Sequence, residues 1–247
     1  MEIEFIGVGE AFDPSLGNAS YLVKSKTNML IDCGYAVPRN FFERKHPADL
    51  VDILYLTHFH ADHGFGIPAL FFRWSNEKRS KPLFILGQNG TENYIDRLLE
   101  IAYPGMRSKI SFELSFLERE ESFDFNELSL HFAETYHPMK NYAIRIEAGN
   151  KSAGFSGDGA LTPASRQLFQ PCHVLVHEAF CFEKDFPGHT TAKEVMAYAE
   201  QLPKLETLAL VHLQRDEREQ QWEKFQDLQQ KASFSVLIPE PGDVIKV

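Results

Sequence analysis

Four potential metal ligands lie within six consecutive residues, in the segment Thr57-His58-Phe59-His60-Ala61-Asp62-His63-Gly64. His58 and His60 are two residues apart, so on an extended segment their side chains point to the same side. Asp62 and His63 follow where Gly64 and an apolar run indicate that a helix begins. Imidazole and carboxylate groups together suit zinc, manganese or iron. A surface cluster of histidines is the alternative, but the apolar run 51–56 directly before the segment reads as a buried strand and favours a metal site.

The pattern His-x-His-x-Asp-His resembles the signature of the metallo-β-lactamase superfamily. The wider segment from Leu56 to Leu70 is most similar to the ribonuclease Z branch of that superfamily. The superfamily fold needs further ligands from separate later loops, each at the end of a strand. Three candidates occur in that order: His137 after an alternating strand, Asp158 in a Gly-Asp-Gly turn, and His212 at the end of an apolar strand. Each alone is a weak signal, because such residues are more often structural.

The resemblance implies a dinuclear centre. His58, His60 and His137 would hold one metal ion, Asp62, His63 and His212 the other, and Asp158 would bridge both. Two divalent ions, two carboxylates and a hydroxide leave a net charge of about +1, which favours an anionic substrate, and coordination lowers the pKa of water from 15.7 towards ~7. We therefore expect two divalent ions, with zinc first and manganese or iron as alternatives, and we expect Asp62 to be essential for hydrolysis.

Two later segments resemble ribonuclease Z in particular. Its His-Glu-Ala stretch is similar to the segment Val174-Leu175-Val176-His177-Glu178-Ala179. Its His-Ser-Thr segment is similar to Gly188-His189-Thr190-Thr191-Ala192. In that family the matching Glu and His assist proton delivery to the leaving group, so Glu178 and His189 are catalytic candidates. The alternatives are a strand-end acid at Glu178 and a helix cap at Thr190 or Thr191.

The remaining polar candidates are interpreted as residues that support the site, pack in the core or lie on the surface. Asp32 resembles the early acid of the superfamily that orients a metal-binding histidine. His177 is expected in the core or at a strand end, and surface or satisfied packing positions are expected for His46, His131 and His173. The basic residues Arg73, Lys78, Arg79 and Lys81 read as a solvated loop after a helix, with an RNA contact as the alternative.

Composition sets the broad class. The chain has 247 residues, a net charge of −10 and 43% hydrophobic residues, which suits one large α/β (α+β) domain over residues 1–247. No apolar run approaches the ~20 residues needed to cross a bilayer, the N-terminus lacks a basic signal region, and three scattered cysteines suggest no disulfide framework. These features predict a cytoplasmic protein. The acidic balance disfavours long-range attraction of nucleic acid.

Predicted strands outnumber helices and come in consecutive runs, so helices should cover the outer faces of two stacked sheets. This is the four-layer αββα sandwich that the resemblance also implies. The expected strands are 2–8, 20–24, 28–32, 52–57, 82–87, 110–115, 127–133, 141–147, 152–156, 173–177, 206–212 and 234–238. The expected helices are 63–74, 91–103, 162–168, 190–202 and 215–230, the last with a solvated outer face.

The predicted function is a dinuclear metal-dependent phosphodiesterase of the ribonuclease Z-like type, acting on RNA or a small phosphodiester. A hydrolase of another bond, such as a lactone or thioester, is the first alternative, and a non-catalytic scaffold is the second. Three departures from ribonuclease Z disfavour pre-tRNA as substrate: only 20 residues separate His137 from Asp158, Gly159 follows Asp158, and Leu213-Gln214-Arg215 follows the last histidine. A homodimer is compatible with the sequence, which does not determine the oligomeric state.

Overall fold

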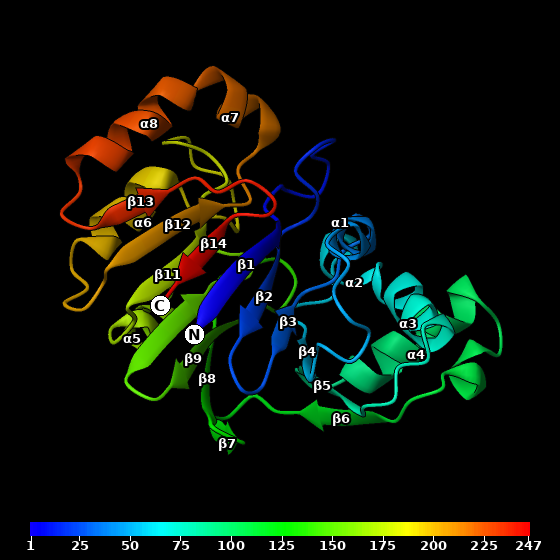
Figure 1. Ribbon diagram of the computed structural model, residues 1–247. Coiled ribbons are helices and arrows are strands. Elements are labelled where there is room, and N and C mark those ends of the chain that lie inside the picture. Colours follow the sequence, from blue (N-terminus) through cyan, green and yellow to red (C-terminus); the bar gives the residue numbers. More distant parts are fainter.

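Two mixed β-sheets face each other in the computed structural model, which describes the backbone of residues 1–247 and every side chain except that of Lys231. Each sheet has seven strands (Figure 1). The first sheet has the strand order β14 (Val244–Lys246), β1 (Glu2–Gly7), β2 (Ser20–Lys24), β3 (Met29–Ile31), β4 (Ile53–Tyr55), β5 (Leu83–Gly87) and β6 (Leu114–Glu118). The second has the order β13 (Ser235–Leu237), β12 (Thr207–Val211), β11 (Val174–Glu178), β10 (Lys151–Phe155), β9 (Tyr142–Ala148), β8 (Leu128–Glu134) and β7 (Phe123–Phe125).

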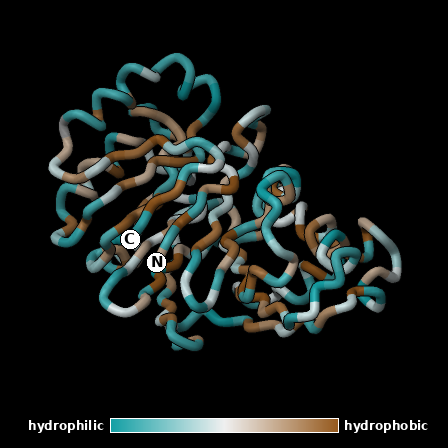
Figure 2. Tube along the Cα trace, in the orientation of Figure 1, coloured by the Kyte–Doolittle hydropathy of each residue, from teal (hydrophilic) through white to brown (hydrophobic). Residues whose placement is uncertain are grey.

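Apolar side chains fill three layers between and outside these sheets. The central layer joins Phe5 and Tyr21 of the first sheet to Phe155 of the second, and the rings of Tyr21 and Phe155 stack with their centroids 5.5 Å apart. The first sheet is covered on its outer face by α1 (Val37–Glu43), α3 (Ile67–Asn76) and α4 (Thr91–Ala102). The second is covered by α5 (Pro163–Phe169), α6 (Ala192–Ala199) and α8 (Trp222–Lys231). The predicted αββα sandwich is therefore confirmed, and Figure 2 shows its apolar strands between more polar helices.

The topology brings the candidate ligand loops to one edge. Strands β3, β4 and β5 are parallel neighbours in the first sheet, and β10, β11 and β12 are parallel neighbours in the second. Parallel neighbours end at the same edge of a sheet, which is where α/β proteins place their binding sites. In the first sheet, Asp32 follows β3 and the 58–63 cluster follows β4. In the second sheet, Asp158 follows β10, the residues after Glu178 follow β11, and His212 follows β12.

Some elements differ from the sequence prediction. The expected helix 63–74 is two helices, α2 (Ala61–Gly64) and α3, because the chain turns at Phe65–Gly66. The expected helix 215–230 divides at Gln221 into α7 (Arg215–Gln220) and α8, and its outer-face interpretation was incomplete, because Phe225 is fully buried. The strand expected at 110–115 lies at Leu114–Glu118, where pairing with β5 sets its register.

Four short elements were not predicted: α1, the 3-10 turn η1 (Met106–Lys109), β7 and β14. Among the described helices, none combines the length and apolar character needed to cross a membrane.

Candidate metal centre

The first group of candidate ligands comes from both sheets. His58, His60, His137 and Asp158 offer ligand atoms that all lie within 4.8 Å of one another. His60 Nδ1 lies 3.0 Å from His58 Nε2 and 3.2 Å from His137 Nε2. The backbone carbonyl of Gly188 lies 2.9 Å from His137 Nδ1 and can accept its proton, which would leave His137 Nε2 directed at the group as a lone-pair donor.

The second group lies beside the first. It consists of Asp62, His63, Asp158 and His212, again with ligand atoms within 4.8 Å of one another. His63 Nε2 lies 3.2 Å from Asp62 Oδ2, and His212 Nε2 lies 3.5 Å from the same oxygen. All seven predicted ligands are thus brought together in two groups.

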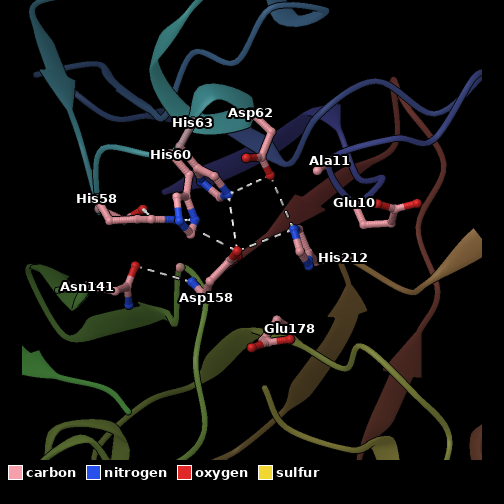
Figure 3. A network of polar contacts seen from close by, with 12 residues as sticks. Glu10, Ala11, His58, His60, Asp62, His63, Asn141, Asp158, Glu178 and His212 are labelled. Carbon is pink, nitrogen blue, oxygen red and sulfur yellow. Dashed lines mark hydrogen bonds and ion pairs between the residues drawn. The ribbon is translucent and has the colours of Figure 1, made fainter. Parts of the chain in front are cut away.

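Asp158 belongs to both groups, as Figure 3 shows. Its Oδ2 lies 3.8 Å from His58 Nε2, 3.4 Å from His63 Nε2 and 3.4 Å from His212 Nε2. The turn that carries it begins at Gly157, whose φ of 59° is in the left-handed region that favours glycine. A Cβ at Gly157 would also lie 2.3 Å from Asn141 Oδ1, so this position needs glycine for space as well.

Asp32 fixes the loop that carries the 58–63 cluster. Its Oδ2 lies 2.8 Å from His63 Nδ1, and its Oδ1 accepts a hydrogen bond from the Thr57 N–H at 2.9 Å. The Thr57 hydroxyl donates to Asp32 Oδ2 at 2.8 Å. A carboxylate on Nδ1 leaves the Nε2 of His63 for the second group, which is how an outer acid orients a metal-binding histidine. The structure thus places Asp32 where the sequence predicted it.

The electrostatics of the two groups favour a bound cation. Burial opposes protonation of His212, but Asp158 and Asp62 outweigh it and raise its pKa to about 9. Burial opposes ionisation of Asp158, yet the neighbouring histidines lower its pKa well below its ordinary value. His63 Nε2 and both ring nitrogens of His212 are buried without a hydrogen-bond partner. Buried polar atoms normally have partners, so these nitrogens fit a metal ion as the missing one.

Glu178 and His189 form a pair next to the two groups. His189 Nδ1 lies 3.1 Å from both carboxylate oxygens of Glu178, which is fully buried at the end of β11. Gly159 N–H also donates to Glu178. Burial lowers the pKa of His189, but the hydrogen bond to Glu178 outweighs it and the net pKa is raised. Glu178 is also the last residue of β11, and Thr191 caps α6, so both alternatives for this region describe real positions. Thr190 is not the cap and donates to the Gly159 carbonyl.

A pocket of about 570 Å³ opens onto these residues. Sequence reasoning missed its aromatic lining, which comes from three separate loops and consists of Phe12, Tyr35, Phe180 and Phe186. Phe12 is 74% exposed, Tyr35 49% and Phe186 48%. Sequence reasoning also missed Glu10 on the pocket wall, whose buried carboxylate accepts a hydrogen bond from Arg215 Nη1 at 2.6 Å. Single aromatic residues in irregular loops give no periodic signal, so no sequence pattern pointed to them.

The basic cluster after α3 was interpreted wrongly at Arg79. That side chain is buried, stacks over the rings of Trp74 and Phe112, and donates to three backbone carbonyls of the neighbouring loops. It is neither part of a solvated loop nor free to contact RNA. The aromatic packing and the carbonyl partners satisfy a charge that the sequence alone suggested was on the surface.

Comparison with known proteins agrees with this fold. Residues 1–234 match the family model described as "Anti-Pycsar protein Apyc1". Ribonuclease Z of Shouchella clausii is 30% identical over 156 residues, which are 61% of this chain and 49% of that protein. Ribonuclease Z of Pediococcus pentosaceus is 28% identical over 155 residues, or 60% of this chain and 49% of that protein. The matches to these curated relatives span about half of their length.

Solved structures share the fold along the whole chain. The short form of human tRNase Z superposes with a TM-score of 0.80 at 21% identity, covering 100% of this chain and 99% of that one. A diphosphatase from the PhnP family gives a TM-score of 0.76 at 16% identity, covering 100% and 97%. The protein therefore belongs to the Apyc1 family of anti-Pycsar proteins, within the ribonuclease Z-like branch of the metallo-β-lactamase superfamily.

Proposed function

We propose that this protein is a metal-dependent phosphodiesterase that uses two divalent ions. The observation that carries the proposal is that two groups of ligands share Asp158 and lie beside the Glu178–His189 pair. The ligands of the first ion would be His58, His60 and His137, and those of the second would be Asp62, His63 and His212, with Asp158 serving both. The donor set of imidazoles and carboxylates suits zinc, with manganese or iron as alternatives.

When bound, two divalent ions lower the pKa of water and balance the charge that develops on a phosphodiester. The chain supplies the proton. His189 lines the pocket, and with its Nδ1 held by Glu178 its other ring nitrogen is left to protonate the departing oxygen. Glu178 orients that ring and stabilises its charged form, as the raised pKa of His189 supports.

The lining of the pocket supports a small nucleotide phosphodiester as substrate. Exposed aromatic faces at a pocket mouth stack on nucleobases at roughly 1–3 kcal/mol per base. Phe12, Tyr35 and Phe186 are such faces and lie around the candidate ligands. A grip on a large RNA has less support, because the residues between His137 and Asp158 form only β9 and β10 with their turns, and Arg79 is buried.

Hydrolysis assays test this proposal directly. Purified protein with added zinc or manganese should hydrolyse bis(p-nitrophenyl) phosphate and a dinucleotide, and Asp62→Ala should abolish both activities. Asp96→Ala removes an exposed acid paired with Arg107 and serves as the matched control, which should keep full activity. Protein that opens lactones or thioesters efficiently but leaves every phosphodiester intact would place the function outside this proposal.

Assembly and location are part of the same proposal. A homodimer in solution would appear as a mass near twice 28.3 kDa by light scattering, and a monomer mass would exclude it. A cytoplasmic location is supported by the three free, buried cysteines, since disulfides are common in oxidising compartments.

A further inference from the structure

A third group of ligand atoms shares His212 with the second group. Glu178, His189 and His212 offer ligand atoms within 4.8 Å of one another, separate from the other two groups except for His212. Two imidazoles and one carboxylate are a set of donors that binds zinc in proteins, with a fourth position left for water. From this geometry we propose that Glu178, His189 and His212 form a third, weaker metal site, and that an ion bound there inhibits the enzyme.

The burial of the group supports a ligand more than a solvated cluster. Glu178 is fully buried and His212 nearly so, and both ring nitrogens of His212 lack a hydrogen-bond partner. The second ion needs only one of those nitrogens, so the dinuclear centre leaves the other ring nitrogen of His212 without a partner. His189 is partly exposed and lines the 570 Å³ pocket together with His212, so an ion can reach the group from solvent.

The surroundings hold the third group in place. The rings of His189 and His212 lie nearly parallel, with their centroids 5.9 Å apart and an interplanar angle of 12°. Phe180 stacks on His189 at 4.5 Å, and Gly159 N–H donates to Glu178. A group whose members are already ordered loses little conformational freedom when an ion binds.

The shared histidine explains why this site would be the weakest. With three ions present, His212 would serve the second ion through one ring nitrogen and the third ion through the other, so its imidazole would have to give up both N–H protons. That deprotonation costs free energy, and the third ion also displaces the hydrogen bond between His189 and Glu178. Both effects reduce the affinity for a third ion relative to the first two.

An ion at this site would occupy the proposed proton donor. A His189 ring bound to a metal ion cannot also be the doubly protonated imidazolium that donates a proton, so excess metal should slow the reaction. This consequence rests on the proposed function, whereas the metal site itself does not. Inhibition should be largest for a dinucleotide, whose alkoxide leaving group needs a proton, and should approach the roughly 10²–10⁴-fold loss expected without a general acid.

The test counts bound zinc by equilibrium dialysis against buffers of rising free Zn²⁺. Wild-type protein should bind two ions tightly and a third at higher free zinc. His189→Gln and Glu178→Gln should each stop at two. His131→Gln is the matched control, because His131 is a histidine near Glu147 outside the pocket, and it should still bind three.

The results separate the alternatives. Saturation of the wild type at two ions overturns the third site, as does a third ion that persists in both His189→Gln and Glu178→Gln. His189→Gln also covers the case in which Glu178→Gln fails to fold, since Glu178 is buried and His189 is not. Protein that binds three ions by this pattern but hydrolyses no phosphodiester would retain the third site and reject the proposed function.

Discussion

The buried amide of Asn141 holds the turn that carries Asp158: its Oδ1 accepts a hydrogen bond from the Asp158 N–H at 3.2 Å. The Nδ2 of the same side chain donates to the Ser156 carbonyl at 2.9 Å and to Thr135 Oγ1 at 2.8 Å. The next residue, Tyr142, donates its N–H to the Thr57 carbonyl at 3.1 Å, directly before the histidine cluster. The consecutive residues Asn141 and Tyr142 therefore link the loop of the central carboxylate to the loop of the first histidines.

Removal of this amide should weaken metal binding as well as stability. Asn141→Ala leaves a buried N–H and a buried carbonyl without partners, which costs roughly 1–3 kcal/mol for each unsatisfied group. We expect a lower free energy of unfolding in urea and, separately, a weaker zinc affinity in chelator competition at a temperature where the variant is folded. Asn89→Ala, at an exposed position, is the control and should change neither. Unchanged zinc affinity in folded Asn141→Ala would limit Asn141 to a purely structural role.

His189 should contribute to the rate without contributing to the first two metal ions. His189→Ala is expected to keep two bound ions and to lower the rate on a dinucleotide by roughly 10²–10⁴-fold, the usual range for general acid catalysis. The loss should be smaller for a nitrophenolate leaving group, which departs with little help from a proton. Equal losses on the two substrates would argue against proton delivery by His189.

Phe12 should select substrates that carry a base. Phe12→Ala is expected to lower kcat/KM for the p-nitrophenyl ester of thymidine 5′-phosphate by roughly tenfold, within the range for loss of one stacking contact. Methyl p-nitrophenyl phosphate has the same leaving group and no base, so its kcat/KM should not change. Phe65→Ala is the matched control, since Phe65 is a 52% exposed phenylalanine that lies outside the metal pocket. A similar loss on both esters in Phe12→Ala would exclude base stacking there.

The acid stability of the fold should depend on Glu4. Burial raises the pKa of this carboxyl, but hydrogen bonds from His46 and Lys24 outweigh it, so the pKa falls from 4.5 to about 2. Because the folded-state pKa is lowered, the stabilisation is fully present above pH 4.5 and is lost as the pH falls towards 2. The difference in unfolding free energy between metal-free wild type and Glu4→Gln should shrink by about 2 kcal/mol from pH 6 to pH 3. A difference that is constant over this range would contradict the lowered pKa.

The sequence predicted the elements and ligands that follow strong local patterns. The apolar run before His58 and the strands that precede Asp158 and His212 lie within two residues of their expected bounds, because buried strands need consecutive apolar residues. The αββα layering followed from those strands together with the resemblance. That residues 1–247 fold as a single domain stays a prediction.

Features that depend on tertiary contact could not be predicted. Arg79 looks exposed in sequence because its partners are the carbonyls of Ala48, Val51 and Pro82, which only the fold brings near. The Glu10–Arg215 pair joins residues 205 positions apart. The seven residues of α1 have Pro38 in the first turn but lack a side-chain N-cap and an acidic first turn, so the local signals were too few to predict that helix.

The metal content of protein purified without chelator tests the central claim most directly. Elemental analysis should find about two divalent ions per chain in the wild type and clearly fewer in Asp158→Ala, because that carboxylate belongs to both groups of ligands. No more than a trace of metal in the folded wild type, including after dialysis against zinc or manganese, would contradict the account.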